Sequence, residues 1–183
     1  MWKKILRNGH RYVLWAVLSV VFWAWIVSRV TDARPQNKVV VYADLDLMDG
    51  RALSLQFDER LPDGIKYVEF DRFDDMIFSP TSVLTGDLYL IPQSKIHDYF
   101  ASFAPIDRTL FPGASFFEQG GTAYGVCVYD EEAGVKLGGD RIAYPPGERC
   151  YLFFNKDSKH VGLNEAAYDD AASAVAAIFI DLK

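Results

Sequence analysis

The chain is poor in the residues that most often carry chemistry. Its 183 residues include two cysteines and three histidines, and only His97 and His160 lie beyond the first 31 residues. No Gly-x-Ser-x-Gly turn is present, which excludes the nucleophile elbow of the α/β-hydrolases. The Gly-Gly pairs at 120–121 and 138–139 lack a phosphate-cradling pattern. We therefore expect no catalytic residue, no cofactor and no metal site.

Acidic residues are absent from the first 31 positions, since all 25 Asp and Glu lie from Asp32 onward. Five of the 19 Lys and Arg precede Asp32, which leaves 14 basic residues and a formal charge of −11 for the rest of the chain. Phosphate binding depends on clustered Lys and Arg. Nucleic acid is therefore not expected as a partner.

A long uncharged run is the most informative feature that is present. From Tyr12 to Val30 the only charged residue is Arg29, and as a helix this stretch spans roughly 28 Å, close to the hydrocarbon thickness of a bilayer. Four basic residues precede it, which predicts a cytoplasmic N-terminus: Lys3, Lys4, Arg7 and Arg11. A cleaved signal peptide cut after Ala33 is the alternative.

This run divides the chain into four parts. We predict a basic cytoplasmic segment over 1–11, a single-pass transmembrane helix over 12–30, a linker over 31–37 and one extracytoplasmic domain over 38–183. No cysteine follows the apolar run closely, so a lipid anchor is not signalled and the helix itself is the tether to the cell membrane.

Cys127 and Cys150 both fall in strand-like segments of the predicted domain. In an oxidising compartment they would be able to form a disulfide. Proximity is not readable from sequence, so two buried free thiols remain the alternative.

Strand and helix patterns alternate through the first half of this domain. Lys38–Ala43 is a nearly continuous apolar run, typical of a strand covered on both faces. The following segments predict, in order, a helix from Asp49 to Pro62, a strand over 65–70, a short helix over 79–86, a strand over 88–91 and a Ser94-capped helix ending at Pro105. Strands over 124–129 and 150–154 and a closing helix over 165–182 follow. The pattern predicts an α/β domain with a mostly parallel sheet and helices on both faces.

Two carboxylates directly follow the first strand, at Asp44 and Asp46. The carboxyl ends of strands are where ligands bind in α/β sheets, and aspartate-nucleophile phosphatases use this placement with magnesium. Met48 stands where that class usually has Thr or Val. A phosphatase-like enzyme is therefore a distant alternative to solvated turn residues that cap a helix.

Aromatic residues make up 15% of the chain. Four tyrosines of the domain are candidates to line a pocket for a sugar or peptide, although such a residue is more often part of a strand core with its hydroxyl at the rim: Tyr42, Tyr124, Tyr144 and Tyr151.

A collinear series of short motifs runs from Lys38 to about Ser158. It comprises Lys38-Val-Val-Val-Tyr-Ala, Phe57-Asp-Glu, Gly64-Ile-Lys, Gly86-Asp-Leu-Tyr, Ala104-Pro-Ile-Asp, Ala123-Tyr-Gly-Val and Leu152-Phe-Phe-Asn-Lys. The series resembles the extracellular solute-binding proteins of bacterial ABC importers, of the maltose-binding kind. Such proteins normally have a second lobe of similar size, whereas this sequence reaches only Lys183.

The resemblance implies one lobe of a periplasmic-binding-protein-like fold, with ligand contacts at the carboxyl ends of strands. The implied ligand-binding residues are Tyr42, Asp44, Asp46, Pro92, Gln93, Ser94 and Tyr124. The expected partners are the lipid bilayer, through residues 12–30, and a small solute or a membrane transport protein. A non-catalytic scaffold of the cell envelope is the main alternative.

Overall fold

The computed structural model describes residues 2–31, 34–47, 49–58, 60–72, 86–162, 167 and 169–182. The chain forms two compact units, residues 1–34 and 35–183. The predicted short helix over 79–86 lies largely outside the described residues, as does Glu165, the predicted start of the closing helix.

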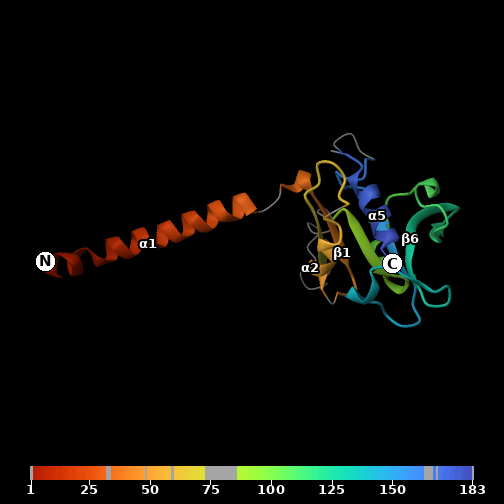
Figure 1. Cartoon of the computed structure of the whole chain (residues 1–183), viewed down its shortest axis with the longest axis horizontal. Helices are drawn as coiled ribbons and strands as arrows, with labels where there is room; N and C mark the ends of the chain where they lie inside the picture. The colour runs from red at the N-terminus through yellow and green to blue at the C-terminus, as the bar shows by residue number, and fades with distance from the viewer. Residues whose placement is uncertain are drawn as a thin grey trace. The chain divides into compact units, whose positions relative to one another are not determined.

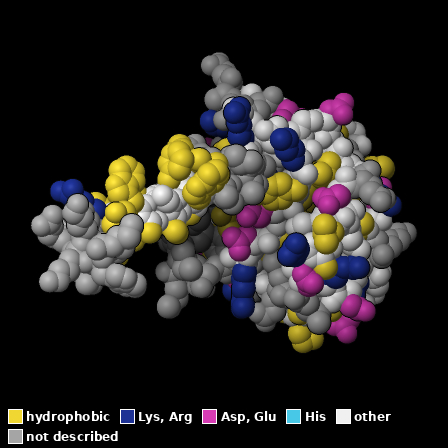
Figure 2. All heavy atoms as spheres, turned by 60° about the vertical axis from the view of Figure 1, so that its left-hand side comes forward, with side chains coloured by type: hydrophobic (Ala, Val, Ile, Leu, Met, Phe, Trp, Pro, Cys, Tyr) yellow, Lys and Arg dark blue, Asp and Glu magenta, His cyan; other side chains and the backbone are white. Residues whose placement is uncertain are grey.

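The first unit is one helix, α1 (Trp2–Thr31). Its large apolar side chains described between Tyr12 and Trp25 are all exposed, from 49% at Leu18 to 68% at Trp15 and Val20, and Figure 2 shows apolar side chains gathered along it. No helix among the described residues combines the length and the apolar character needed to cross a membrane.

The second unit is an α/β domain built on one mixed sheet (Figure 1). Its strands are β1 (Lys38–Ala43), β3 (Tyr67–Arg72), β4 (Leu88–Pro92), β5 (Phe116–Gln119), β6 (Thr122–Asp130), β7 (Val135–Lys136) and β9 (Cys150–Phe154). The order is β3-β1-β4-β9-β6-β5, and β7 pairs with β6. A separate two-stranded sheet pairs β2 (Asp46–Leu47) with β8 (Ile142–Ala143).

The expectation of a mostly parallel sheet is wrong. β1 is parallel to both β3 and β4, as predicted for the first half of the domain. β9, however, inserts antiparallel between β4 and β6, and β5 and β6 form an antiparallel hairpin closed at Gly120 and Gly121. Every residue of β9 is buried because apolar cores cover both faces of the sheet. In this fold such burial on both faces extends to antiparallel strands as well.

Helices lie on both faces of the sheet, as expected. α2 (Gly50–Leu55) and α5 (Ala171–Asp181) belong to the larger apolar core on one face. On the other face the smaller core includes Ile96 of α4 (Ile96–Tyr99) and Phe103. Side chains alternate between the two cores along β4, with Leu88 and Leu90 on one side and Tyr89 and Ile91 on the other.

The predicted helices of the domain that fall on described residues form but are shorter or broken. Asp49 caps α2 by accepting a hydrogen bond from Ala52 N at 2.9 Å, yet the helix ends at Leu55 because i→i+3 bonds then tighten the chain. The segment after β4 divides into the 3-10 helix η2 (Gln93–Lys95), α4 and the 3-10 helix η3 (Phe100–Ser102). Ser94 lies within η2 rather than at its cap.

Of the two alternatives for Cys127 and Cys150, the structure has the second, because both are buried free thiols and no disulfide joins them. They lie on the neighbouring strands β6 and β9, but Cys127 packs into the smaller core and Cys150 into the larger one. Side chains on opposite faces of a sheet point apart and do not bridge. Burial raises the pKa of both thiols, that of Cys150 to about 12.

Candidate functional site

One edge of the sheet gathers the ends of several strands. β1, β4 and β6 run in the same direction, and β9 runs against them, so the carboxyl ends of the first three lie beside the start of β9. Ligands of α/β sheets bind outside such carboxyl ends. We call the hollow at this position the edge groove, and it has two halves that share Ser94 and Glu148.

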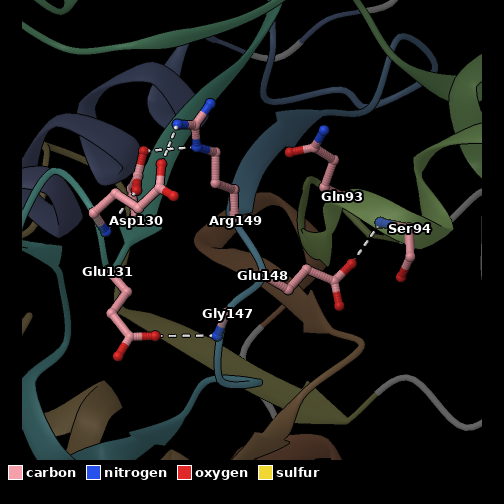
Figure 3. A pocket seen from close by; sticks show the side chains of 8 residues that line it. Gln93, Ser94, Asp130, Glu131, Gly147, Glu148 and Arg149 are labelled. Atoms are coloured by element: carbon pink, nitrogen blue, oxygen red, sulfur yellow. Dashed lines mark hydrogen bonds and ion pairs between the residues drawn. The ribbon is translucent and has the colours of Figure 1, made fainter.

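The first half, the acidic half, has a volume of about 710 Å³ (Figure 3). It is lined mainly by charged and polar residues from the ends of β4 and β6 and the start of β9: Gln93, Ser94, Asp130, Glu131, Glu132, Glu148 and Arg149. Four of these side chains are carboxylates and one is a guanidinium, so the acidic half has an excess of negative charge.

Asp130 and Arg149 fix one wall of the acidic half. Arg149 Nε lies 2.7 Å from Asp130 Oδ2, and the neighbouring guanidinium nitrogen lies 3.5 Å from Glu132 Oε2. The charge of Asp130 raises the pKa of Arg149. Asp130 Oδ1 also accepts hydrogen bonds from the backbone N–H groups of Glu132 and Ala133. This carboxylate is therefore fully engaged.

Glu131 and Glu148 are held differently, by backbone N–H groups. Glu131 Oε2 accepts from Gly147 N at 3.1 Å, and Glu148 Oε1 accepts from Ser94 N at 2.6 Å. Figure 3 shows these two contacts on either side of the Gly147 turn. Within the part of the chain that the structure describes, neither carboxylate has a basic partner.

The second half, the mixed half, has a volume of about 420 Å³ and carries both signs of charge. Asp44 and Glu148 face Lys95 and Arg72 in its lining, beside Pro145 and Pro146. It lies where β1 and β4 end.

Asp44 is the most constrained residue of the mixed half. Its side chain is only 10% exposed, and its Oδ1 lies 2.7 Å from the ammonium nitrogen of Lys95. Its Oδ2 is buried and has no hydrogen-bond partner among the described residues. An unsatisfied buried carboxylate oxygen costs free energy that a donor would recover.

Tyr144 leads into the loop that carries Gly147 and Glu148. Its ring stacks on Tyr129 of β6, with centroids 4.6 Å apart and an interplanar angle of 2°. Its hydroxyl donates a hydrogen bond to Leu137 O at 2.9 Å. The loop is thus held at its start by Tyr144 and at its end by β9.

The structure brings together four of the seven predicted ligand-binding residues, namely Asp44, Pro92, Gln93 and Ser94. Tyr42 and Tyr124 lie elsewhere, on the face of the smaller core. Tyr42 stacks on Tyr89 at 6.3 Å, and Tyr124 packs edge-on against Phe100 at 4.8 Å. Asp46 belongs to β2, paired with Ala143, and its side chain is outside the description.

Sequence reasoning missed Lys95, Asp130, Glu148 and Arg149. The Pro145-Pro146-Gly147 turn directly before an apolar strand was the available signal for the last two, because residues flanking a buried strand lie at a sheet edge. The long distance in sequence between Asp44 and Glu148 hid the fact that both line the same half of the groove.

A second cluster of polar residues is buried at the opposite ends of these strands. Ser158 donates a hydrogen bond to Asp87 Oδ1 at 2.6 Å and accepts one from the backbone N–H of His160. The His160 ring nitrogens face Asp169 Oδ1 at 2.7 Å and Pro35 O at 2.9 Å. Both nitrogens are engaged away from the Ser158 hydroxyl, so this Ser, His and Asp set ties chain segments together rather than activating a nucleophile.

Among the described residues, no three His, Cys, Asp or Glu side chains are grouped so that they could hold a metal ion.

No family model matches the chain, and no curated protein or solved structure shows significant similarity to it.

Proposed function

We propose that the protein is a membrane-anchored, extracytoplasmic solute-binding-like domain that binds a small polar solute in the edge groove and performs no catalysis. One observation carries this proposal. Asp44 directly follows β1, Pro92 ends β4, and Gln93 and Ser94 follow β4. These residues converge with Glu148 on a hollow at the carboxyl edge of the sheet. Polar groups converging on such a hollow are typical of solute sites.

The first unit supports the membrane part of the proposal. Residues 12–28 contain no charged side chain, and the large apolar side chains between Tyr12 and Trp25 are exposed. An apolar surface of this extent is stabilised by lipid. Lys3, Lys4, Arg7 and Arg11 favour a cytoplasmic N-terminus, with the second unit on the other side of the membrane.

The contacts of the groove favour binding over catalysis. Asp44, the residue that a phosphatase-like enzyme would use as its nucleophile, already contacts Lys95 and is nine-tenths buried. Glu131 and Glu148 are fixed by backbone donors. The groove thus presents fixed charges and hydrogen-bonding groups, which determine solute orientation and specificity.

Thermal unfolding of the full chain in detergent tests the proposal. A panel of maltose, glucose, a dipeptide, L-lysine and L-glutamate is added in turn, and at least one solute is expected to raise the unfolding temperature, because a ligand that binds only the folded state stabilises it. Glu148→Lys, in the groove, should abolish that shift. Glu118→Lys, on β5 outside the groove, should retain it.

No shift with any solute would contradict solute binding and favour a scaffold that binds another envelope protein. Magnesium-dependent phosphate release that Asp44→Asn abolishes would instead support the phosphatase-like alternative. For the orientation, a reporter fused after Lys183 is expected to be extracytoplasmic, and a cytoplasmic reporter would overturn this placement.

A further inference from the structure

Lys95 occupies the edge groove in a way that indicates what else binds there. Its primary ammonium group lies on Asp44 Oδ1 at 2.7 Å, while 40% of its own side chain is exposed. Asp44 is held in place by its backbone, whose N–H donates to Leu90 O at 2.9 Å. The ammonium can therefore leave for solvent, while the carboxylate cannot follow it.

The second carboxylate oxygen of Asp44 can accept a further hydrogen bond. Its Oδ2 is buried and without a hydrogen-bond partner among the described residues, in a side chain that is nine-tenths buried and lines the mixed half. A carboxylate satisfies both oxygens by receiving two or more N–H donors. An ammonium group carries three donors and is small enough to enter a site from which Lys95 has moved.

The acidic half adds a second place for positive charge. Glu131 and Glu148 each accept one backbone hydrogen bond and have no basic partner in the described part of the chain. Glu148 lines both halves and Glu131 lines the acidic half, so a ligand that bound at Asp44 and extended past Glu148 would enter the half that Glu131 lines. A second amine on the ligand would meet these carboxylates.

We propose that the edge groove selects a small organic cation carrying a primary amine, which displaces Lys95 from Asp44. This rests on the proposed function and names its solute class. A diamine is the preferred form, because its second ammonium is neutralised by Glu148 and Glu131. Lys95 then acts as an internal competitor that occupies the carboxylate when the groove is empty.

Isothermal titration calorimetry of the full chain in detergent tests this, at constant ionic strength because charge contacts are screened by salt. The probes are 1,4-diaminobutane, butylamine, butan-1-ol and tetramethylammonium. We expect affinity to fall in that order for the first three. Tetramethylammonium carries charge but no N–H donor, so it should bind no better than the alcohol. Equal binding of all four would overturn the proposal.

Two variants test the roles of the residues in opposite directions. Asp44→Asn should weaken diamine binding by roughly ten- to hundredfold, the range expected for a lost hydrogen bond to a charged group. Lys95→Met should tighten it, because the competitor is removed. Lys136→Met is the matched control, since Lys136 pairs with exposed Asp140 outside the groove, and it should leave affinity unchanged.

If Asp44→Asn fails to fold, Lys95→Met still decides the question, and unchanged or weaker amine binding in that variant would refute displacement. Binding of maltose or glucose without any amine binding would refute this inference and leave solute binding intact. Loss of binding to every solute would refute both.

Discussion

His160 is a titratable side chain enclosed by the domain, at 3% exposure. Nδ1 lies 2.7 Å from Asp169 Oδ1 and Nε2 lies 2.9 Å from Pro35 O, so each ring nitrogen is beside an oxygen that can accept a hydrogen bond. These contacts favour the protonated form of the ring, which donates from both nitrogens. Burial alone would lower the pKa of His160, but the hydrogen bonds to Pro35 and Asp169 and the charge of Asp87 outweigh it and raise that pKa.

This predicts a stability that depends on pH. Because the folded-state pKa of His160 is raised, its contribution is fully present below the unfolded value of about 6.5 and is lost as pH rises through the folded pKa. The free energy of unfolding, measured with urea from pH 6 upward, should therefore decline in the wild type. In His160→Gln this decline should be absent.

His97→Gln provides the control, since His97 is exposed on α4. It should retain the wild-type pH dependence. A decline that persists unchanged in His160→Gln would show that another group is responsible. Burial also raises the pKa of Asp87, and a raised carboxyl pKa likewise lowers stability as pH rises, so a decline that persists in His160→Gln would point to Asp87.

At the level of helices and strands, the apolar pattern of the sequence predicted which strands form better than it predicted their order in the sheet. β1, β4 and β9 were expected from their apolar runs and are present. Their order was not readable, because the insertion of β9 beside β4 joins residues 58 to 66 positions apart in the sequence, from the Pro92–Cys150 pair to the Leu88–Phe154 pair. For the same reason Asp44 and Ser94 were predicted at the site, whereas Glu148, which depends on that insertion, was not.

The prediction of one continuous helix after β4 was wrong for a local reason. The periodic Ile96, Tyr99 and Phe103 suggested one continuous helix, but i→i+3 bonding divides the segment, as in the bond from Phe103 N to Phe100 O. Periodicity locates the buried face without distinguishing an α-helix from a run of short turns.

α5 closes the larger core through Phe179. This ring is 2% exposed and lies 6.4 Å from Phe57 and 6.0 Å from Phe70 of β3. Phe179→Ala should lower the free energy of unfolding by about 3–5 kcal/mol, because the cavity left behind adds to the lost burial. Leu55→Ala, at a side chain 60% exposed, should change it by less than about 0.5 kcal/mol. Similar losses in both variants would contradict the packing of α5 on the sheet.

For the whole molecule, the division into two compact units predicts that one can be removed. The two cores consist entirely of residues from 39 onward. A chain beginning at Pro35 should therefore unfold cooperatively, with a urea midpoint close to that of the full chain.

The same truncated chain should no longer remain with membranes after alkaline extraction, whereas the full chain should. A truncated chain that fails to fold would show that α1 contributes to the stability of the domain. One that still resists extraction would overturn the assignment of the anchor to residues 12–30.

The stacked rings of Tyr144 and Tyr129 have a consequence for how fast and how selectively the proposed solute would bind. They immobilise one end of the Glu148 loop, and β9 immobilises the other. The conformational entropy of the Glu148 loop is thus lost when the domain folds, and not when a solute binds. A solute would meet a rigid template, so differences in affinity between related solutes should arise mainly in their dissociation rates.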